Sequence, residues 1–196
     1  ITYGENDYCA GSSIETMVSI AKSATKLTAN SVETTYGENK DMIITLTDSA
    51  DNPIANATVT VNLNGNKNYK TDKNGQIKIP TGNITPNNYI AKISFEDEYY
   101  FASTIETAVV VNKIASKLTA NNVTATYNVN KNLIISLKDS EGNPISKVSV
   151  SVDLGSVKNY VTDEKGQINI PVQKLVPKTY VAKIKFKGNS HYIESE

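Results

Sequence analysis

The side chains that could support hydrolysis are few, and they stand in turns rather than in a shared pattern. A hydrolytic centre needs a nucleophile, a base and a group that orients the base. The chain has one histidine, His191, in a turn that holds no histidine where its sequence recurs. Asp48 and Asp72 could pair as acid and base, but both belong to turns in which an aspartate hydrogen-bonds its own backbone. The sequence therefore predicts no enzyme activity, no catalytic residue and no cofactor.

Metal binding and cross-linking have equally little support. A calcium site needs six or more oxygen ligands, and the acidic turns, which recur at Asp139 and Asp163, lack the Asp-x-Asp-x-Asp spacing that supplies them. A Lys to Asn isopeptide bond requires a buried lysine beside an acid, whereas strand alternation directs Lys92, Lys183 and Glu106 away from the core. The sequence favours a chain without a metal or an isopeptide bond, and both stay as alternatives.

Cysteine and asparagine offer other covalent chemistry. Cys9 is the only cysteine, which excludes an intrachain disulfide, and we expect a buried thiol there. Sequons for N-glycosylation stand at Asn56, Asn83 and Asn122. Asn56 falls in a turn and is the strongest of the three candidates.

A repeat of 91 residues organises the chain. Lys26–Phe95 aligns without a gap on Lys117–Phe186, with about half of the positions identical. The same shift with one inserted residue places the first 22 residues on Ile93–Lys113. We therefore expect the end of one repeat at 1–23, a complete repeat at 24–114, and at 115–196 a repeat without its last strand, all cut from a longer array.

Composition narrows the class of partner. Lysines and acidic residues balance at 20 each, so the chain has no net charge to attract nucleic acid or an acidic membrane. Arginine, the residue best suited to bidentate phosphate contacts, is absent. No apolar run approaches the length of a membrane span. We expect neither nucleic-acid binding nor membrane insertion in this segment.

Short alternating runs of apolar and polar residues predict antiparallel strands. The seven expected in the complete repeat are 26–36 (with a break allowed inside it), 42–48, 57–64, 68–71, 76–80, 89–95 and 104–112. Seven short strands in about ninety residues are typical of an all-β, two-sheet sandwich of the Ig-like type. Tyr89 and Tyr180 each open the penultimate strand, where a tyrosine hydroxyl often bonds back to the preceding connection. The linker 111–116 has no glycine, so we expect end-to-end domains with little hinge freedom.

Several motifs resemble the bacterial-type Ig-like repeats of prokaryotic surface proteins, most closely those of adhesin-like proteins from methanogenic archaea. They are Thr28-Ala29-Asn30, Asn52-Pro53-Ile54, Tyr69-x-Thr71-Asp72-x-x-Gly75, Tyr-x-Ala-Lys-Ile-x-Phe at 89–95, and Phe186-x-Gly188-Asn189-x-x-Tyr192. The complete repeat departs from the last of these, since its turn after Phe95 is one residue shorter and has no glycine. The resemblance covers nearly the whole chain, and it implies the Ig-like fold and a cell-surface or extracellular location.

The two partial repeats fit each other. Ser13–Ala21 is a last strand without a body, and 115–196 is a body without a last strand. In a covalent array the next stretch of chain would supply the missing strand. In the alternative, a pilus-like filament subunit, residues 13–21 would complete a neighbouring copy through the face formed by Ile14, Thr16, Val18 and Ile20. Both hypotheses describe a fibre-forming surface protein. Its partners would be neighbouring repeats, copies of itself, or surface glycans and proteins.

Overall fold

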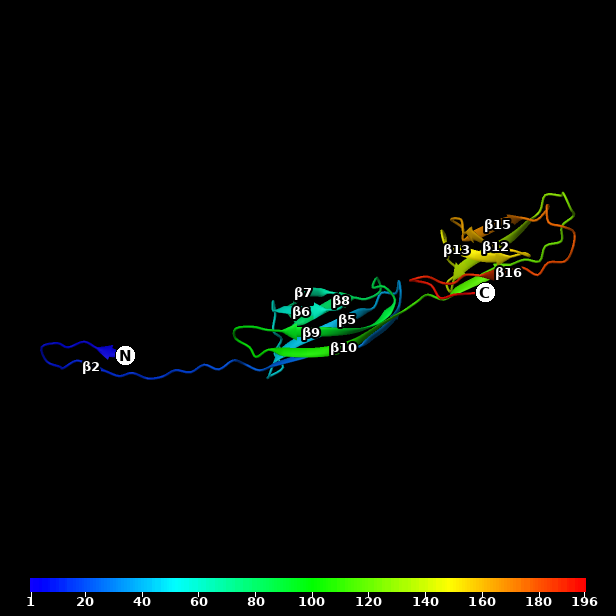
Figure 1. The fold of residues 1–196 in the computed structure, drawn as a ribbon. Helices are drawn as coiled ribbons and strands as arrows, with labels where there is room; N and C mark the ends of the chain where they lie inside the picture. Colours follow the sequence, from blue (N-terminus) through cyan, green and yellow to red (C-terminus); the bar gives the residue numbers. More distant parts are fainter.

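The computed structural model describes residues 1–196, and every regular element in it is a β-strand. Two β-sandwiches follow one another along an elongated molecule, and a thin N-terminal segment extends from the first (Figure 1). The first hydrophobic core is built from residues between Leu27 and Val111, and the second from residues between Leu133 and Phe186. The expected all-β sandwich fold is confirmed. The division into folding units at 24–114 and 115–196 stays a prediction.

The first sandwich contains eight strands in two sheets. One sheet has the order β3-β5-β8, with β3 at Thr25–Ala29, β5 at Asp41–Asp48 and β8 at Gln76–Pro80. The facing sheet has the order β4-β10-β9-β6-β7: Val32–Thr35, Ser103–Asn112, Asn87–Phe95, Thr58–Asn62 and Asn66–Lys70. The first expected strand is indeed broken in two, and β3 and β4 join different sheets. Such a switch between sheets is how a short strand helps to close a sandwich.

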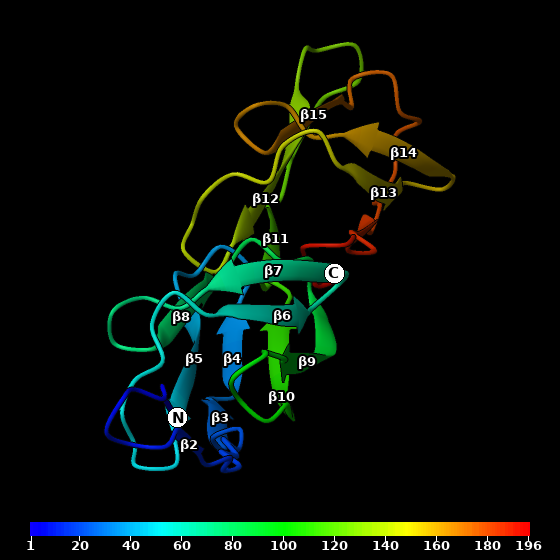
Figure 2. The same ribbon diagram turned by 90° about the vertical axis from the view of Figure 1, so that its left-hand side faces the viewer.

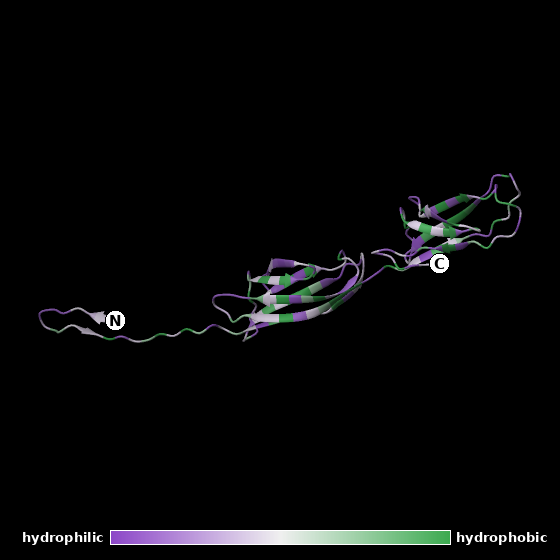
Figure 3. Ribbon diagram, viewed as in Figure 1, coloured by the Kyte–Doolittle hydropathy of each residue, from purple (hydrophilic) through white to green (hydrophobic).

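Alternation of side chains explains how each strand reaches the core. In β5, Met42, Ile44 and Leu46 are buried, while the intervening residues are exposed or half-buried. Figure 3 shows the same alternation as apolar and polar bands along the strands of both sandwiches. Because successive side chains point to opposite faces of a sheet, the sequence pattern sets which face of each strand is directed toward the core.

The second sandwich repeats only part of this arrangement. The sheet β11-β12-β15 consists of Ser116–Ala120, Asn132–Asp139 and Gln167–Pro171 and corresponds to β3-β5-β8. The facing sheet, β14-β13-β16, consists of Val157–Val161, Ser149–Asp153 and Lys183–Lys185. It has no counterpart of β10 or of β4. The segment 123–126, which corresponds to β4, is irregular. Figure 2, a view along the long axis, shows long loops between the strands of the second sandwich.

Aspartates fix the turns as the sequence predicts. Asp48 Oδ1 accepts hydrogen bonds from the backbone N–H groups of Ala50 and Asn52, and Asp139 does the same for Glu141 and Asn143. Asp72 and Asp163 accept equivalent bonds in the next turn of each sandwich. These carboxylates therefore serve the scaffold.

The hydrogen bonds to Asp48 predict a loss of stability in acid. Bonds from Asn52, first from its side chain and then from its backbone, lower the pKa of Asp48. A lowered folded-state pKa means that the stabilisation is complete above the unfolded-state pKa and is lost as the pH falls through the folded one. We expect thermal melts of the first sandwich to change little down to about pH 5 and to fall between about pH 4 and pH 2.

Asp48→Asn should lower stability at pH 7 and flatten that acid dependence, because an amide can replace only part of the carboxylate's accepting capacity. The control is Asp41→Asn, which makes the same change at an exposed residue of β5. Equal acid dependence in the Asp48 variant and the parent would contradict the assignment.

The N-terminal segment differs from expectation in two ways. Cys9 is exposed, because residues 1–13 form a separate small hairpin in which β1 (Thr2–Tyr3) pairs only with β2 (Ser12–Ser13). The expectation of a buried thiol is therefore wrong. Only the start of the predicted strand 13–21 is paired: Ser13 belongs to β2, and Ile14 exchanges backbone hydrogen bonds with Ile1. Residues 15–21 have no neighbouring strand.

The tyrosine prediction is confirmed in both sandwiches. The Tyr89 hydroxyl donates to the carbonyl of Thr85 at 2.7 Å, and that of Tyr180 to the carbonyl of Val176 at 3.0 Å. In the second sandwich this bond holds the 176–180 loop, although Tyr180 does not open a strand there, because the next strand is only Lys183–Lys185.

Candidate functional site

In the first sandwich β10 lies in the middle of one sheet and completes the core. It pairs with β9 in antiparallel register and with β4 in parallel register. Val109 and Val111 on its inner face are buried, and Ile105 packs against the same core. Removing such a strand would leave a slot between β4 and β9 and expose the core residues that line it.

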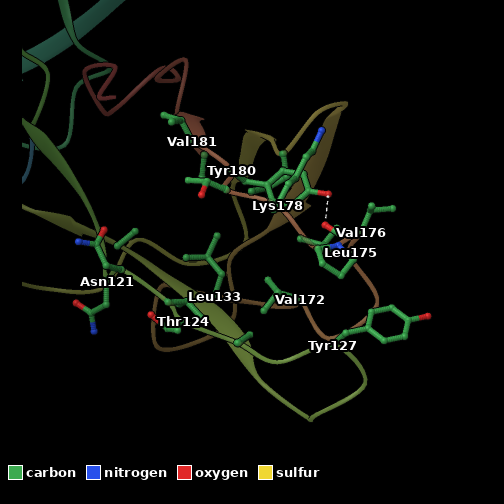
Figure 4. A pocket seen from close by; sticks show the side chains of 18 of the residues that line it. Asn121, Thr124, Tyr127, Leu133, Val172, Leu175, Val176, Lys178, Tyr180 and Val181 are labelled. Carbon is green, nitrogen blue, oxygen red and sulfur yellow. Dashed lines mark hydrogen bonds between the residues drawn. The ribbon is translucent and has the colours of Figure 1, made fainter.

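The second sandwich contains that slot as an open groove of about 780 Å³. One wall is formed by 120–127, the counterpart of the β4 region, and the other by 175–182, the counterpart of the loop and start of β9. Leu133 and Val172 lie between the walls, as Figure 4 shows. Most of the lining residues are hydrophobic.

Corresponding residues show how far the core is opened. Val32, Ala91 and Ile93 are at most 2% exposed in the first sandwich. Their counterparts Val123, Ala182 and Ile184 are only partly buried, and all three line the groove. Ala125, in the place of the buried Thr34, is exposed at the groove wall. The groove therefore exposes several apolar side chains whose counterparts a strand covers in the first sandwich.

The chain already enters the groove in the correct register. In the first sandwich, Ser103 begins β10 opposite Phe95. In the second, Ser195 forms a bridge with Phe186, with both backbone N–H to carbonyl bonds present. The first pair of the missing strand is thus in place.

The predicted donation face lies at the opposite end of the molecule. Ile14, Val18 and Ile20 are 66%, 81% and 91% exposed, and Thr16 is exposed as well. These four residues occupy the repeat positions of Ile105, Thr107, Val109 and Val111, the inner face of β10. The structure therefore holds an uncovered strand sequence and an uncovered strand slot, without bringing them together.

The joint between the sandwiches has defined contacts. The Tyr36 and His191 rings stack with centroids 4.3 Å apart, and Lys113 Nζ donates to the carbonyl of Asn189 at 2.7 Å. Ile114 is held by backbone bonds to His191 and Ile193 on the second sandwich. His191, the only histidine of the chain, is thus an aromatic contact between sandwiches.

The pKa of Tyr192, beside this joint, is raised by burial, and then by the charge of Asp139 and by Tyr36. Tyr192 packs against the second hydrophobic core, which accounts for its burial.

The residues considered for glycosylation, cross-linking and metal binding form no common site. Asn56, Asn83 and Asn122 are all exposed, and their glycosylation stays a prediction; Asn122 also lines the groove. Lys92, Lys183 and Glu106 are exposed, as strand alternation predicts. No group of three or more His, Cys, Asp or Glu side chains is placed to hold a metal ion. The structure also contains no helix that could cross a membrane.

The sequence analysis predicted the donation face but did not predict that residues of the groove would be exposed. Val123, Ala182 and Ile184 look like ordinary core residues in the sequence. Their exposure follows only from asking which side chains β10 covers in the first sandwich.

Comparison with known proteins gives likenesses in structure. No protein-family model matches the chain, and a search of curated proteins finds no match. Among solved structures it is similar to invasin, a bacterial integrin-binding protein, with a TM-score of 0.48 and 20% identity over 85% of this chain and 37% of the other. The match thus spans little more than a third of the length of the invasin chain.

Two ice-binding adhesins are similar over a greater share of this chain. One is a 1.5-MDa bacterial ice-binding adhesin (TM-score 0.36, 15% identity, 89% of this chain and 62% of that one). The other is a Ca²⁺-stabilised adhesin with which an Antarctic bacterium binds ice (TM-score 0.29, 15% identity, 90% and 50%). We take these matches as similarities of β-rich architecture and draw no ligand from them.

Proposed function

We propose that the chain is part of a non-enzymatic, cell-surface rod of tandem Ig-like sandwiches that acts as an adhesin stalk or as a multivalent adhesive fibre. The observation that carries the proposal is the end-to-end arrangement of two sandwiches with a short, contacted joint (Figure 1). The sequence resemblance to surface repeats of methanogenic archaea supports the same location.

A rod of this kind has a physical advantage for adhesion. Many copies of a weak binding surface on one fibre gain effective concentration, so avidity does not require a deep pocket in any single repeat. The partners would be surface glycans or proteins. Two tyrosines at equivalent strand positions, Tyr69 and Tyr160, are candidates for contacting such partners. Each packs against the core of its own sandwich, so each is less suited to binding a partner.

Small-angle scattering with a joint variant tests the rod. We expect the parent to scatter as an elongated particle, and Tyr36→Ala to bend more freely because the aromatic contact to His191 is lost. Tyr99→Ala removes an equivalent ring that is 72% exposed, and is the control. A compact parent, or identical flexibility in all three proteins, would contradict the proposal.

The groove favours a second candidate function, a subunit of a non-covalent surface filament. Strand addition to an incomplete sheet supplies main-chain hydrogen bonds for affinity and side-chain pockets for register. In this alternative the rods would be joined by strand donation rather than by peptide bonds.

A further inference from the structure

We propose that Asn64, at the tip of the β6–β7 hairpin, is a site of spontaneous deamidation, whereas the fold protects the same dipeptide at Asn74. The chain has two Asn-Gly dipeptides, Asn64-Gly65 and Asn74-Gly75. Both asparagines are exposed, so exposure alone does not distinguish them. They differ in how freely the glycine that follows can move. This modification goes beyond the proposed rod function and does not depend on it.

Deamidation of an Asn-Gly dipeptide begins at the backbone nitrogen of the glycine. That nitrogen attacks Cγ of the asparagine side chain, the C–N bond of the side-chain amide breaks, and ammonia leaves with the proton of the glycine N–H. The product is a cyclic imide, which water opens at either carbonyl to give aspartate or isoaspartate. Glycine favours the attack because it has no Cβ to hinder the approach and because its backbone rotates freely.

Gly65 meets these requirements. Asn64 and Gly65 belong to the loop 63–65 between β6 and β7, and both are exposed. A Cβ added to Gly65 would meet no atom within 4 Å, so no neighbouring group restricts the backbone there. The Gly65 N–H donates to Asn62 Oδ1 at 3.4 Å, which is longer than a well-formed hydrogen bond. The Gly65 nitrogen is therefore available to attack Asn64.

Gly75 is held in place on every side. It is buried, its N–H donates to the carbonyl of Asp72 at 3.0 Å, and its carbonyl accepts from the N–H of Leu46 at 2.9 Å. A Cβ added there would lie 2.4 Å from the Leu46 carbonyl oxygen. The Asn74 N–H is also bonded, to Asp72 Oδ1 at 2.8 Å. Rotation into the geometry of attack would break these bonds, so the reaction at Asn74 requires the turn to open first.

Deamidation changes both the charge and the length of the hairpin loop. Each product carries one negative charge in place of a neutral amide, in a chain whose lysines and acidic residues balance at 20 each. Isoaspartate also adds a methylene group to the backbone. Strand β7 is at the edge of its sheet and pairs with β6 alone, and the length of the loop sets the register of a hairpin. We expect the pair Asn62–Asn66, next to the loop, to loosen first.

The second sandwich supplies the matched control variant. Gly155 and Ser156 occupy the repeat positions of Asn64 and Gly65, so that hairpin has no asparagine to react. Gly155 has a φ of 97° and Asn64 a φ of 58°, both in the left-handed region that glycine adopts readily. Asn64→Gly therefore removes the side-chain amide and leaves the loop free to keep its conformation.

Peptide mapping by mass spectrometry after incubation in mildly alkaline buffer tests the site. We expect the peptide that contains Asn64 to gain about 1 Da and to separate into two products. The rate should exceed that at Asn74 by at least about tenfold, because the folded turn protects Asn74. In concentrated urea the two rates should become similar. Equal rates in the folded chain would overturn the proposal, as would a folded chain that reacts at Asn64 no faster than Asn64→Gly gains mass in the same peptide.

Hydrogen exchange of fresh and incubated protein tests the effect on the hairpin. We expect faster exchange of the amides of 66–70 after deamidation and unchanged exchange in β5. Fresh Asn64→Asp carries the added charge without the added methylene group, so it should exchange like the fresh parent. Equal exchange of 66–70 in fresh and incubated protein, or equally fast exchange in Asn64→Asp, would overturn the argument from loop length.

Discussion

Extending the chain after Glu196 with a copy of residues 105–113 is expected to stabilise the second sandwich by about 3 kcal/mol or more. Each buried Val or Ile side chain contributes about 1.5–3 kcal/mol, and the added strand buries two valines and part of an isoleucine. Ordering the added residues offsets part of that gain. Glu196 occupies the repeat position of Thr104, so the extension continues the register that the Phe186–Ser195 bridge begins.

Calorimetry and hydrogen exchange would measure this effect. A gain of that size should raise the melting temperature of the second sandwich by at least about 10 °C. Backbone amides of 123–126 and 178–182 should gain protection, while those of the first sandwich should not change.

The control is the same extension with aspartate in the places of Val109 and Val111. Its outward-facing residues are unchanged, yet it would have to bury two charges, so no stabilisation is expected. Equal stabilisation by both extensions would show that the groove does not require an apolar strand face.

Gly75→Ala is expected to destabilise the first sandwich by about 3 kcal/mol or more. Gly75 has a φ of 68°, in the left-handed region, and a Cβ there would lie 2.4 Å from the carbonyl oxygen of Leu46. That carbonyl belongs to the core strand β5, and Leu46 N–H donates to the carbonyl of Gly75 at 2.9 Å. The methyl group therefore forces apart two backbones that must stay in contact.

A variant at Gly37 separates the cost of a steric clash from the cost of a positive φ. Gly37 has a φ of 91°, and a Cβ added there would meet no atom within 4 Å. Its counterpart Asn128 adopts a φ of 67°. Gly37→Asn should therefore change stability by less than about 1 kcal/mol. Urea unfolding followed by hydrogen exchange of β5 and β12 peptides would resolve the two sandwiches. Similar losses for Gly75→Ala and Gly37→Asn would contradict the close-approach argument.

Much of each sandwich was determined by the sequence through short-range physics. Alternation set the buried faces of β5 and β8, Asp48 and Asp72 set the turns, and Tyr89 and Tyr180 made the predicted bonds to residues four positions earlier. These features depend on neighbours in the chain, and each occurs twice, so the repeat reinforced the prediction. The face formed by Ile14, Thr16, Val18 and Ile20 rests on the same alternation and stays a prediction.

Tertiary structure decided what depends on distant partners. A strand exists only when another backbone satisfies its N–H and C=O groups, so residues 15–22 form no strand although their sequence resembles that of β10. Cys9 is exposed because no sandwich body lies beside it, and His191 meets Tyr36 only because the joint aligns two sandwiches. The groove has the same origin. Its wall residues carry a core sequence, and they are exposed because the strand that covers the corresponding residues of the first sandwich has no equivalent between 123–126 and 178–184.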